Sequence, residues 1–311
     1  MSGDLNYRIQ VFGDSIHWGQ GLLPEQKMAY LLKQKLENKN KHLKIRIASN
    51  AHSGAIIGEK SIKNDSELNG EVPRTYPTIL GQIDLAKEID QTNLVLINGG
   101  INDVDVTNIL NPITTQSWLR NTCKKMCHDR MKILLEKVLT RFPEESKTIV
   151  TGYYPIVSEY TVLNLALQLL ILTFTPFFTT PFAITSSVLT KIIANCNTFA
   201  KDANEQLSLA VKEVNKKYEN RIVFVNPNFS AKNAVLTGSN SYLYGITSLG
   251  NPEDPMAKQR EKVCPKTKKI LDLNHAKCIR ASAGHPNIKG EKQYANEIFK
   301  AFISNWSMPE L

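Results

Sequence analysis

The sequence predicts an α/β protein, a three-layer α/β/α sandwich built around a parallel five-stranded sheet. Five strand-like runs alternate with helical patterns along the 311 residues. Strands that are interleaved with helices favour a parallel sheet covered on both faces. Hydrophobic residues make up 42% of the chain, which is enough to bury a large core in a single domain.

The expected strands and helices follow one another in a regular order. Short apolar runs predict strands at residues 7–12, 43–48, 94–97, 148–155 and 221–225. Helical patterns lie near residues 24–37, 78–90, 115–142, 183–217 and 288–304. The chain shows no internal repeat and no low-complexity tail, so one domain over residues 1–311 is the simplest division.

Two stretches depart from this alternation. Residues 227–262 are rich in Asn, Pro, Gly and Ser, and they predict a long loop excursion over about residues 227–280. An apolar insertion is expected at about residues 160–190, because residues 161–190 contain no charged side chain. Pro176 and Pro181 are expected to divide this insertion into two short helices or into a helix and a loop.

A serine follows shortly after the first expected strand. It lies in GDSIHWGQG at residues 13–21, a glycine-punctuated turn that leads to a helix. Open α/β sheets bind ligands outside the carboxyl ends of their strands, so this turn places Ser15 at a ligand-binding edge. Gly-Asp-Ser also occurs in ordinary turns, so the prediction of a site depends on the later motifs.

Three further motifs appear in order along the chain. SNAHSGAIIG after the second expected strand contains Gly54, and GGIND after the third contains Asn102 and Asp103. Near the C-terminus, GHPNIKGEKQYANEI puts His285 in a loop that runs into the final helix. Together the four blocks resemble those of the SGNH/GDSL hydrolase superfamily of serine esterases and lipases, over residues 13 to about 301.

The resemblance implies a flavodoxin-like sandwich of the SGNH hydrolase type, with Ser15 as the nucleophile and His285 as its base. It also implies an oxyanion hole made of the backbone N–H groups of Ser15 and Gly54 and the side-chain amide of Asn102. A serine hydroxyl needs a neighbouring base to remove its proton during attack, and histidine, with an ordinary pKa of about 6.5, suits that task. The donors would stabilise the negative charge that ester cleavage places on the carbonyl oxygen.

One position departs from the family pattern. Where the family usually has an aspartate three residues before the histidine, this chain has Ser282. A carboxylate there would fix the imidazole tautomer and stabilise the imidazolium, which a hydroxyl does less well. Ser282 or a backbone carbonyl is therefore the expected orienter of His285, in a dyad or an atypical triad. Asp272 and His275 have the family spacing, but no Pro-Asn or glycine-initiated final helix follows His275.

The apolar insertion has three interpretations. Its hydropathy makes it a borderline candidate for a membrane span. A single span would put Ser15 and Asn102 on the opposite side of the bilayer from His285, which argues against this interpretation. The segment is then either an extra buried core helix, or a lid or apolar wall beside Ser15 that receives an acyl chain or touches a lipid surface.

Charge and residue spacing limit the partners and cofactors. The net charge of +9 and the basic cluster between Lys258 and Arg280 suit an anionic membrane surface or an acidic glycan, although a solvated loop is the commoner explanation. No basic pattern interleaved with aromatic residues is present, so nucleic-acid binding is not expected. The histidines and cysteines lack metal-ligand spacing and there is no phosphate-binding loop, so neither a metal nor another cofactor is expected.

The five cysteines bear on the cellular location without deciding it. Cys264 and Cys278 bracket a basic segment and form the best candidate disulfide if the protein is exported. Cys123 and Cys127 fall on one face of an expected helix, which rarely suits a disulfide. No signal peptide is visible, which favours a cytoplasmic protein. The alternative is an exported protein whose signal has been removed.

These observations predict a serine-dependent carboxylic ester hydrolase, an esterase or lipase that acts on lipid or acyl esters. A glycan O-acetyl esterase is the second hypothesis, although the apolar insertion does not suggest the small polar pocket that it would need. A third hypothesis, prompted by the absent aspartate, is an inactive member that serves as a binding or membrane-docking module. The expected partner is a small-molecule or lipid ester, with a possible peripheral membrane contact.

Overall fold

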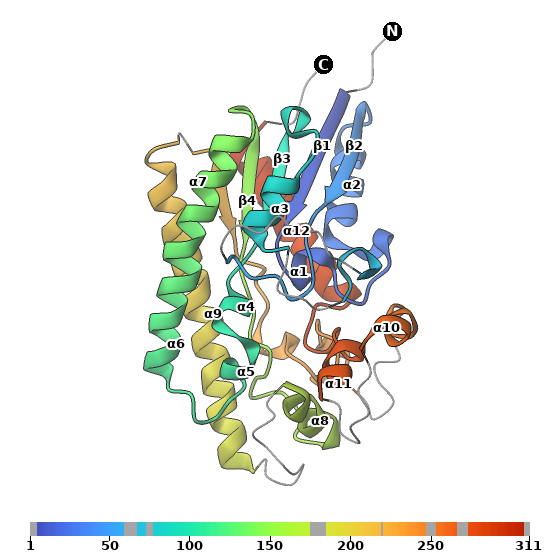
Figure 1. Cartoon of the computed structure of the whole chain (residues 1–311), viewed down its shortest axis with the longest axis vertical. Helices are drawn as coiled ribbons and strands as arrows, with labels where there is room; N and C mark the ends of the chain where they lie inside the picture. Colours follow the sequence, from blue (N-terminus) through green and yellow to red (C-terminus); the bar gives the residue numbers. More distant parts are fainter. Residues whose placement is uncertain are drawn as a thin grey trace.

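The computed structural model of the chain describes residues 5–58, 67–72, 77–174, 185–218, 220–246, 253–265 and 273–307. Its centre is a parallel five-stranded sheet with the strand order β2-β1-β3-β4-β5 (Figure 1). The strands are β1 (Leu5–Phe12), β2 (Leu43–Ser49), β3 (Leu94–Ile97), β4 (Lys147–Thr151) and β5 (Ile222–Val225). The predicted α/β class and the five-stranded parallel sheet are confirmed.

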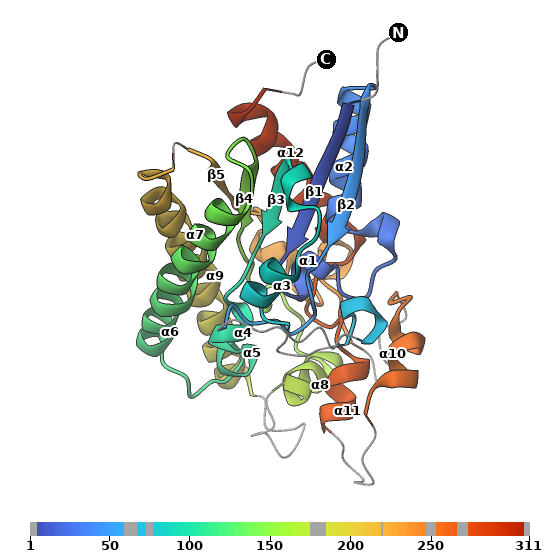
Figure 2. The same cartoon turned by 45° about the horizontal axis from the view of Figure 1, so that its top comes forward.

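Helices cover both faces of the sheet (Figure 2). On one face lie α2 (Met28–Lys39) and α12 (Ile288–Asn305), which pack against each other. On the other face lie α3 (Ile79–Leu85) and α7 (Met131–Arg141), and α9 (Ser186–Asn215) packs against α7. The helix predicted near 115–142 is a continuous run of α6 (Gln116–Cys123), a π-helical turn η4 (Lys124–Arg130) and α7.

The shorter helices gather at the carboxyl edge of the sheet (Figure 1). They are α1 (Ser15–Trp18), α4 (Ile101–Val104), α5 (Val106–Ile109), α8 (Leu165–Phe174), α10 (Ala257–Val263) and α11 (Leu273–Ile279). Single 3-10 turns complete the described elements: η1 (Pro24–Gln26), η2 (Glu67–Gly70), η3 (Ile89–Gln91), η6 (Ala231–Asn233) and η7 (Gly238–Asn240). Long connections therefore collect at the edge where the sequence predicts the site.

The strand order creates a crevice at this edge. From β1 the chain passes to β2 on one side, and then returns to β3 on the other side of β1. Such a reversal leaves an opening beyond the carboxyl ends of the two central strands, which is where open α/β sheets bind ligands. All four residues of β3 are fully buried, so the loops after β1 and β3 stand on a rigid core.

The fourth strand is shorter than the predicted run of residues 148–155. It ends at Thr151. The Tyr153 N–H then donates to Asn204 Oδ1 at 2.7 Å, and Asn204 Nδ2 donates to the Tyr153 carbonyl at 2.9 Å. The Gly152 N–H still donates to the Val225 carbonyl of β5 at 2.9 Å, so the backbone bonds pass from the sheet to a side chain of α9 at Tyr153, where the chain turns toward the site.

The insertion predicted at about 160–190 begins as a partly buried helix. In α8, Leu167, Leu170 and Ile171 are fully buried, whereas Leu165 on the opposite side is 60% exposed. Pro176 and Pro181, with the expected division of the segment there, lie outside the described residues. Within the described ranges, no helix combines the length and apolar character that crossing a membrane requires.

Candidate active site

The chain makes a tight turn between β1 and α1. Gly13 has φ +137°, a conformation that side chains rarely adopt, and a Cβ at this position would lie 1.9 Å from Asn98 Oδ1. Asn98 follows β3, and its side chain accepts from the Asp14 N–H at 3.0 Å and donates to Asp14 Oδ1 at 2.8 Å. The turn that presents Ser15 is therefore fixed against the neighbouring strand, and only glycine leaves room for that contact.

Asp14 braces the turn that presents Ser15. Its carboxylate accepts from the Ile16 N–H at 2.9 Å and caps α1. The Tyr153 hydroxyl donates to the second oxygen at 3.0 Å. Burial raises the pKa of Asp14 to about 6, and the hydrogen bonds from Ile16, Asn98 and Tyr153 oppose that rise. The carboxylate therefore serves the geometry of the turn.

Ser15 and His285 come from opposite ends of the chain and meet at the carboxyl edge. His285 Nε2 lies 2.6 Å from Ser15 Oγ, a hydrogen-bond distance. The histidine loop is fixed by Tyr244, whose carbonyl accepts from the Gly284 N–H at 2.9 Å and whose N–H donates to the His285 carbonyl at 2.8 Å. The Tyr154 hydroxyl adds a third contact, donating to the Gly284 carbonyl at 3.1 Å.

The other ring nitrogen of His285 has no carboxylate partner among the described residues. Nδ1 is buried without a well-formed hydrogen bond there, and the backbone groups that act on the pKa of the ring are those of Ala283 and Ser282. Burial lowers the pKa of His285 to about 4, because the charged imidazolium loses its hydration, while the two carbonyls oppose this shift. The imidazole is consequently neutral at physiological pH.

The structure places Ser282 beside His285, but its hydroxyl does not bond the ring. Ser282 is fully buried, and within the described ranges Oγ has no hydrogen-bond partner. Its carbonyl accepts from the His285 N–H at 2.9 Å. Of the two expected orienters, the hydroxyl therefore makes no bond to the ring, and the backbone carbonyls are the groups that act on its pKa.

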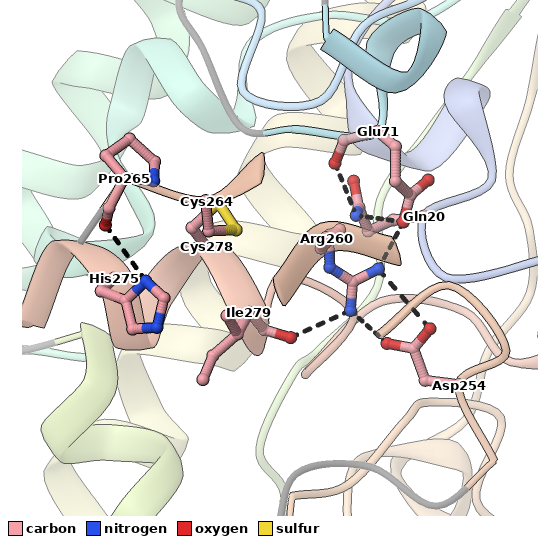
Figure 3. Close-up of a disulfide and its surroundings, with 9 residues drawn as sticks. All are labelled: Gln20, Glu71, Asp254, Arg260, Cys264, Pro265, His275, Cys278 and Ile279. Carbon is pink, nitrogen blue, oxygen red and sulfur yellow. Dashed lines mark hydrogen bonds and ion pairs between the residues drawn. A yellow bond between two sulfur atoms is a disulfide. The ribbon is translucent and has the colours of Figure 1, made fainter. Parts of the chain in front are cut away.

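The alternative pair of Asp272 and His275 is separate from this contact. Asp272 lies outside the described residues. His275 is on α11, and its Nδ1 lies 3.1 Å from the Pro265 carbonyl (Figure 3). Among the residues described around Ser15, the histidine in contact with the serine is His285.

Gly54 and Asn102 lie at the same cavity as Ser15 and His285. Within the described residues, the backbone N–H groups of Ser15 and Gly54 donate to no protein acceptor. Asn102 Nδ2 donates one hydrogen to the Ala55 carbonyl at 2.9 Å, which leaves the second amide hydrogen for a ligand. Asp103 orders the same loop by accepting from the Ile57 N–H at 2.9 Å.

The cavity beside Ser15 is mostly apolar and has a volume of about 190 Å³. Loops after β1, β3 and β4 supply most of its apolar wall, and α8 of the insertion adds one residue. The apolar lining includes Ile16, Ile101, Val106, Leu110, Ile156 and Leu170. The charged residues at the cavity are Asp105 and Lys277. The arrangement places a serine hydroxyl, an imidazole, two backbone N–H groups and an amide beside an apolar space.

Several residues of this site were not predicted from the sequence. Asn98, which ties the Ser15 turn to β3, is signalled only by its position immediately after the third apolar run. Val106 and Leu110 lie four residues apart in the segment after GGIND, a helical spacing that could have identified them as one wall. Ile156 has no such signal.

Known proteins are similar to this chain in sequence pattern and in architecture. The model of a protein family described as GDSL-like Lipase/Acylhydrolase matches residues 9–298. A phospholipase A1 from Streptomyces albidoflavus NA297 has 13% identity over 96% of this chain and 99% of that chain, with a TM-score of 0.49. Lip_vut3, a lipase from a goat rumen metagenome, has 13% identity over 97% and 100%, with a TM-score of 0.49.

A carbohydrate acetylesterase is similar at the same level. Est24 from Sinorhizobium meliloti has 14% identity over 96% of this chain and 100% of that chain, with a TM-score of 0.44. The sequences of curated proteins give no significant match.

The packing of the Ser15 turn predicts the effect of a single added carbon. Gly13→Ala should lower the free energy of unfolding by more than the 1–3 kcal/mol or so of backbone strain, because the new Cβ also overlaps Asn98 Oδ1. Gly238→Ala is a matched control, since Gly238 has φ +70° and a Cβ added there would meet no atom within 4 Å. Urea unfolding of both variants measures the difference. Equal losses would show that the Asn98 contact does not constrain the turn.

Proposed function

The chain belongs to the GDSL-like lipase/acylhydrolase family and is a hydrolase that acts on ester bonds, and from this premise we propose that Ser15 is its nucleophile and His285 its base. The observation that carries the proposal is the 2.6 Å contact between Ser15 Oγ and His285 Nε2 at the mouth of an apolar cavity. Serine and histidine side chains within this distance form the minimal unit of nucleophilic ester cleavage.

The reaction proceeds in two halves. His285 Nε2 takes the Ser15 hydroxyl proton as Oγ attacks the ester carbonyl, and the carbonyl oxygen becomes an oxyanion. The imidazolium then protonates the departing alcohol, which leaves an acyl group on Ser15. A water molecule, deprotonated by His285, attacks this acyl group and releases the carboxylic acid, while the proton returns to Ser15.

The oxyanion is stabilised by the N–H groups of Ser15 and Gly54 and by the Asn102 amide. The free backbone donors support this role, since they need not break a protein hydrogen bond to meet the developing charge. The Ala55 carbonyl holds the Asn102 amide in one orientation. Donors fixed in advance cost little reorganisation when the charge appears.

In the proposed dyad, backbone carbonyls take over from the aspartate the task of fixing the tautomer of His285, while burial keeps the resting imidazole neutral. The carbonyls of Ser282 and Ala283 favour a proton on Nδ1, which leaves the lone pair of Nε2 facing Ser15. Ser282 acts in this scheme through its carbonyl oxygen. This arrangement also argues against the inactive-module hypothesis, because a base remains in place.

Lipid or acyl esters are the substrates that the cavity supports. Its lining is mainly apolar, and Leu170 extends it with a residue of the insertion. A glycan O-acetyl esterase, the second hypothesis, would be better served by a polar pocket. Val162, just before α8, is 56% exposed, and Leu165, its first residue, is 60% exposed; both support a peripheral contact with a lipid surface. The disulfide Cys264–Cys278 supports an exported location over the cytoplasm.

The nucleophile is tested with a covalent probe. A fluorophosphonate should modify Ser15, identified by peptide mass spectrometry, and Ser15→Ala should abolish the modification. Ser53→Ala is the matched control, because Ser53 also lines the cavity and should not affect the modification. Probe attached to Ser15→Ala at the wild-type rate would rule out this nucleophile.

The burial of His285 predicts that kcat/KM falls on the acid side at a lower pH than it would for an ordinary histidine. The active base is neutral His285, so kcat/KM should fall as the pH drops through about 4, the pKa to which burial lowers the imidazole. An unperturbed histidine would give the limb at about 6.5. The profile is measured with a soluble ester whose own ionisation does not change over this range. Burial raises the pKa of Asp14 in the Ser15 turn to about 6, so a limb near 6 to 6.5 would mean that the His285 ring is hydrated only if Asp14→Asn leaves that limb in place.

The oxyanion assignment predicts a selective loss of rate. Asn102→Ala should lower kcat by about 100- to 1000-fold with little change in KM, since the donor acts mainly on the charged intermediate. Asn108→Ala provides a control from the neighbouring helix, where Asn108 Nδ2 donates to the Val104 carbonyl. If Asn102→Ala raises KM and leaves kcat unchanged, Asn102 is an ordinary substrate contact.

The apolar cavity predicts a dependence on acyl length. Each buried methylene contributes about 0.8 kcal/mol, so kcat/KM should rise up to several-fold per carbon until the cavity is filled. Val106→Trp should shorten the preferred chain while sparing an acetate ester, because it fills the wall of the cavity. Val162→Trp, at a 56% exposed position outside the lining, is the control. A profile that peaks at acetate in the wild type would favour the glycan esterase instead.

A further inference from the structure

A buried ionic cluster connects the segment that follows Ser15 with the segment that precedes His285. Arg260 on α10 is fully buried and pairs with two carboxylates, Glu71 after η2 and Asp254 before α10 (Figure 3). The side chains of both acids are at most 1% exposed. Burying such charges costs several kcal/mol per ion and is offset only when geometry and hydrogen bonding are good. The cluster is therefore stable only when the segments that contain Glu71, Asp254 and Arg260 are accurately arranged.

One side of the cluster holds the segment that follows the nucleophile. Glu71 accepts from Trp18 Nε1, from Gln20 Nε2 at 2.8 Å and from the Gly21 N–H at 3.0 Å. Trp18 is the last residue of α1, the helix that begins with Ser15. The position of Glu71 thus fixes both the end of this four-residue helix and the chain that leaves it.

The other side of the cluster holds the start of the histidine loop. Arg260 Nη2 donates to the Ile279 carbonyl at 3.1 Å, at the end of α11. The disulfide Cys264–Cys278 joins α11 to the end of α10, so the two helices move as one unit (Figure 3). From Ile279 a compact turn reaches His285, with the Ala283 N–H donating to the Arg280 carbonyl at 2.9 Å.

The two segments also touch directly beside the cluster. A Cβ on Gly21 would lie 2.7 Å from Ser282 Cβ and 3.1 Å from Asp254 Oδ1. The chain after the nucleophile therefore packs against the residue three positions before His285, where the family usually has its aspartate. Among the described residues these two segments share no disulfide and no strand pairing, so the side chains of the cluster form the bridge between them.

We propose that Arg260 is a positioning residue, which aligns the histidine loop with the nucleophile turn through Glu71, Asp254 and the Ile279 carbonyl. This inference rests on the proposed roles of Ser15 and His285. Arg260 touches neither the cavity lining nor the reacting atoms in the described structure. It acts by keeping the histidine loop at a fixed position relative to Ser15. In a triad, the aspartate that is bonded to the imidazole performs part of this task.

The test replaces Arg260 without removing its charge. Arg260→Lys leaves a cation between the two carboxylates but loses the forked guanidinium that reaches both acids and the Ile279 carbonyl. We expect kcat and the rate of fluorophosphonate modification at Ser15 to fall by about 10- to 100-fold with KM little changed, since small misalignments at a reacting centre have effects of this size.

Arg221→Lys is the matched control for a buried arginine. Arg221 is 8% exposed and donates to the carbonyls of Leu139 and Ser146 at 3.4 Å, at the opposite end of the sheet from Ser15. The control should lose thermal stability and keep the wild-type kcat and modification rate. A purely structural role for Arg260 would give the same pattern in Arg260→Lys, and that result would overturn the proposal.

A second variant covers the case in which Arg260→Lys does not fold. The triple change Glu71→Gln, Asp254→Asn and Arg260→Met removes all three charges together, so that no unpaired ion remains buried. A folded triple variant with reduced kcat and modification rate supports the proposal, and one with wild-type values overturns it. Failure of both variants to fold would also overturn it, because the cluster would then be required by the fold rather than by the alignment.

Modification of Ser15 in the wild-type protein distinguishes a failure of this inference from a failure of the proposed function. If the probe does not modify Ser15 in the wild type, the proposed nucleophile is wrong whatever Arg260 does. If Ser15 is modified in the wild type and equally fast in folded Arg260→Lys, the nucleophile stands and the positioning role is wrong.

Discussion

The hydrogen bond between Ser15 Oγ and His285 Nε2 spans 270 positions of the chain, and the surrounding structure serves to keep it at 2.6 Å. The parallel sheet brings the two residues to one edge, because its strand order reverses at β1 and β3. Asn98 then fixes the Ser15 turn from β3, and Tyr244 fixes the His285 loop from the side. Since both loops rest on buried elements, the contact is assembled before any substrate arrives.

The absence of an aspartate at position 282 changes how the histidine is prepared for catalysis. In a triad, the carboxylate orients the ring and stabilises its charged form. Here burial disfavours the charged form and lowers the pKa of His285, while the carbonyls of Ser282 and Ala283 oppose this shift. Such a base is neutral over a wide pH range but stabilises its own proton weakly. The alignment of the imidazole with Ser15 is correspondingly more important, and the proposed role of the buried Arg260 cluster is to maintain it.

Much of the fold could be predicted because strands and helices depend on local sequence, whereas the pairing of Ser15 with His285, 270 positions apart, was implied by the resemblance of the four motifs to the SGNH/GDSL hydrolases. Apolar runs interrupted by turns identify the strands, and the four motifs each stand at a strand end or helix start. The Arg260 cluster could not be predicted, because Glu71 and Arg260 are 189 positions apart and neither lies in a periodic pattern. The early end of β4 was missed for a related reason, since it depends on the side chain of Asn204 in a distant helix.

The insertion illustrates a further limit of sequence patterns. Its apolar composition predicted either a core helix or a wall of the site, and α8 serves both purposes. Leu167 and Ile171 are buried in the core, while Leu170, between them, lines the cavity beside Ser15. Composition alone could not separate these faces, because a helix that is apolar all round has no periodic contrast from which to read its orientation.

The central claim is that a buried, carboxylate-free histidine serves Ser15, and a crystal structure of the phosphonylated enzyme tests it most directly. We expect the phosphorus to be bonded to Ser15 Oγ and its oxygen to lie within hydrogen-bond distance of the N–H groups of Ser15 and Gly54 and of Asn102 Nδ2. We also expect His285 Nδ1 to face only the backbone carbonyls of Ser282 and Ala283. An aspartate or glutamate bonded to Nδ1, from any part of the chain, would contradict the account.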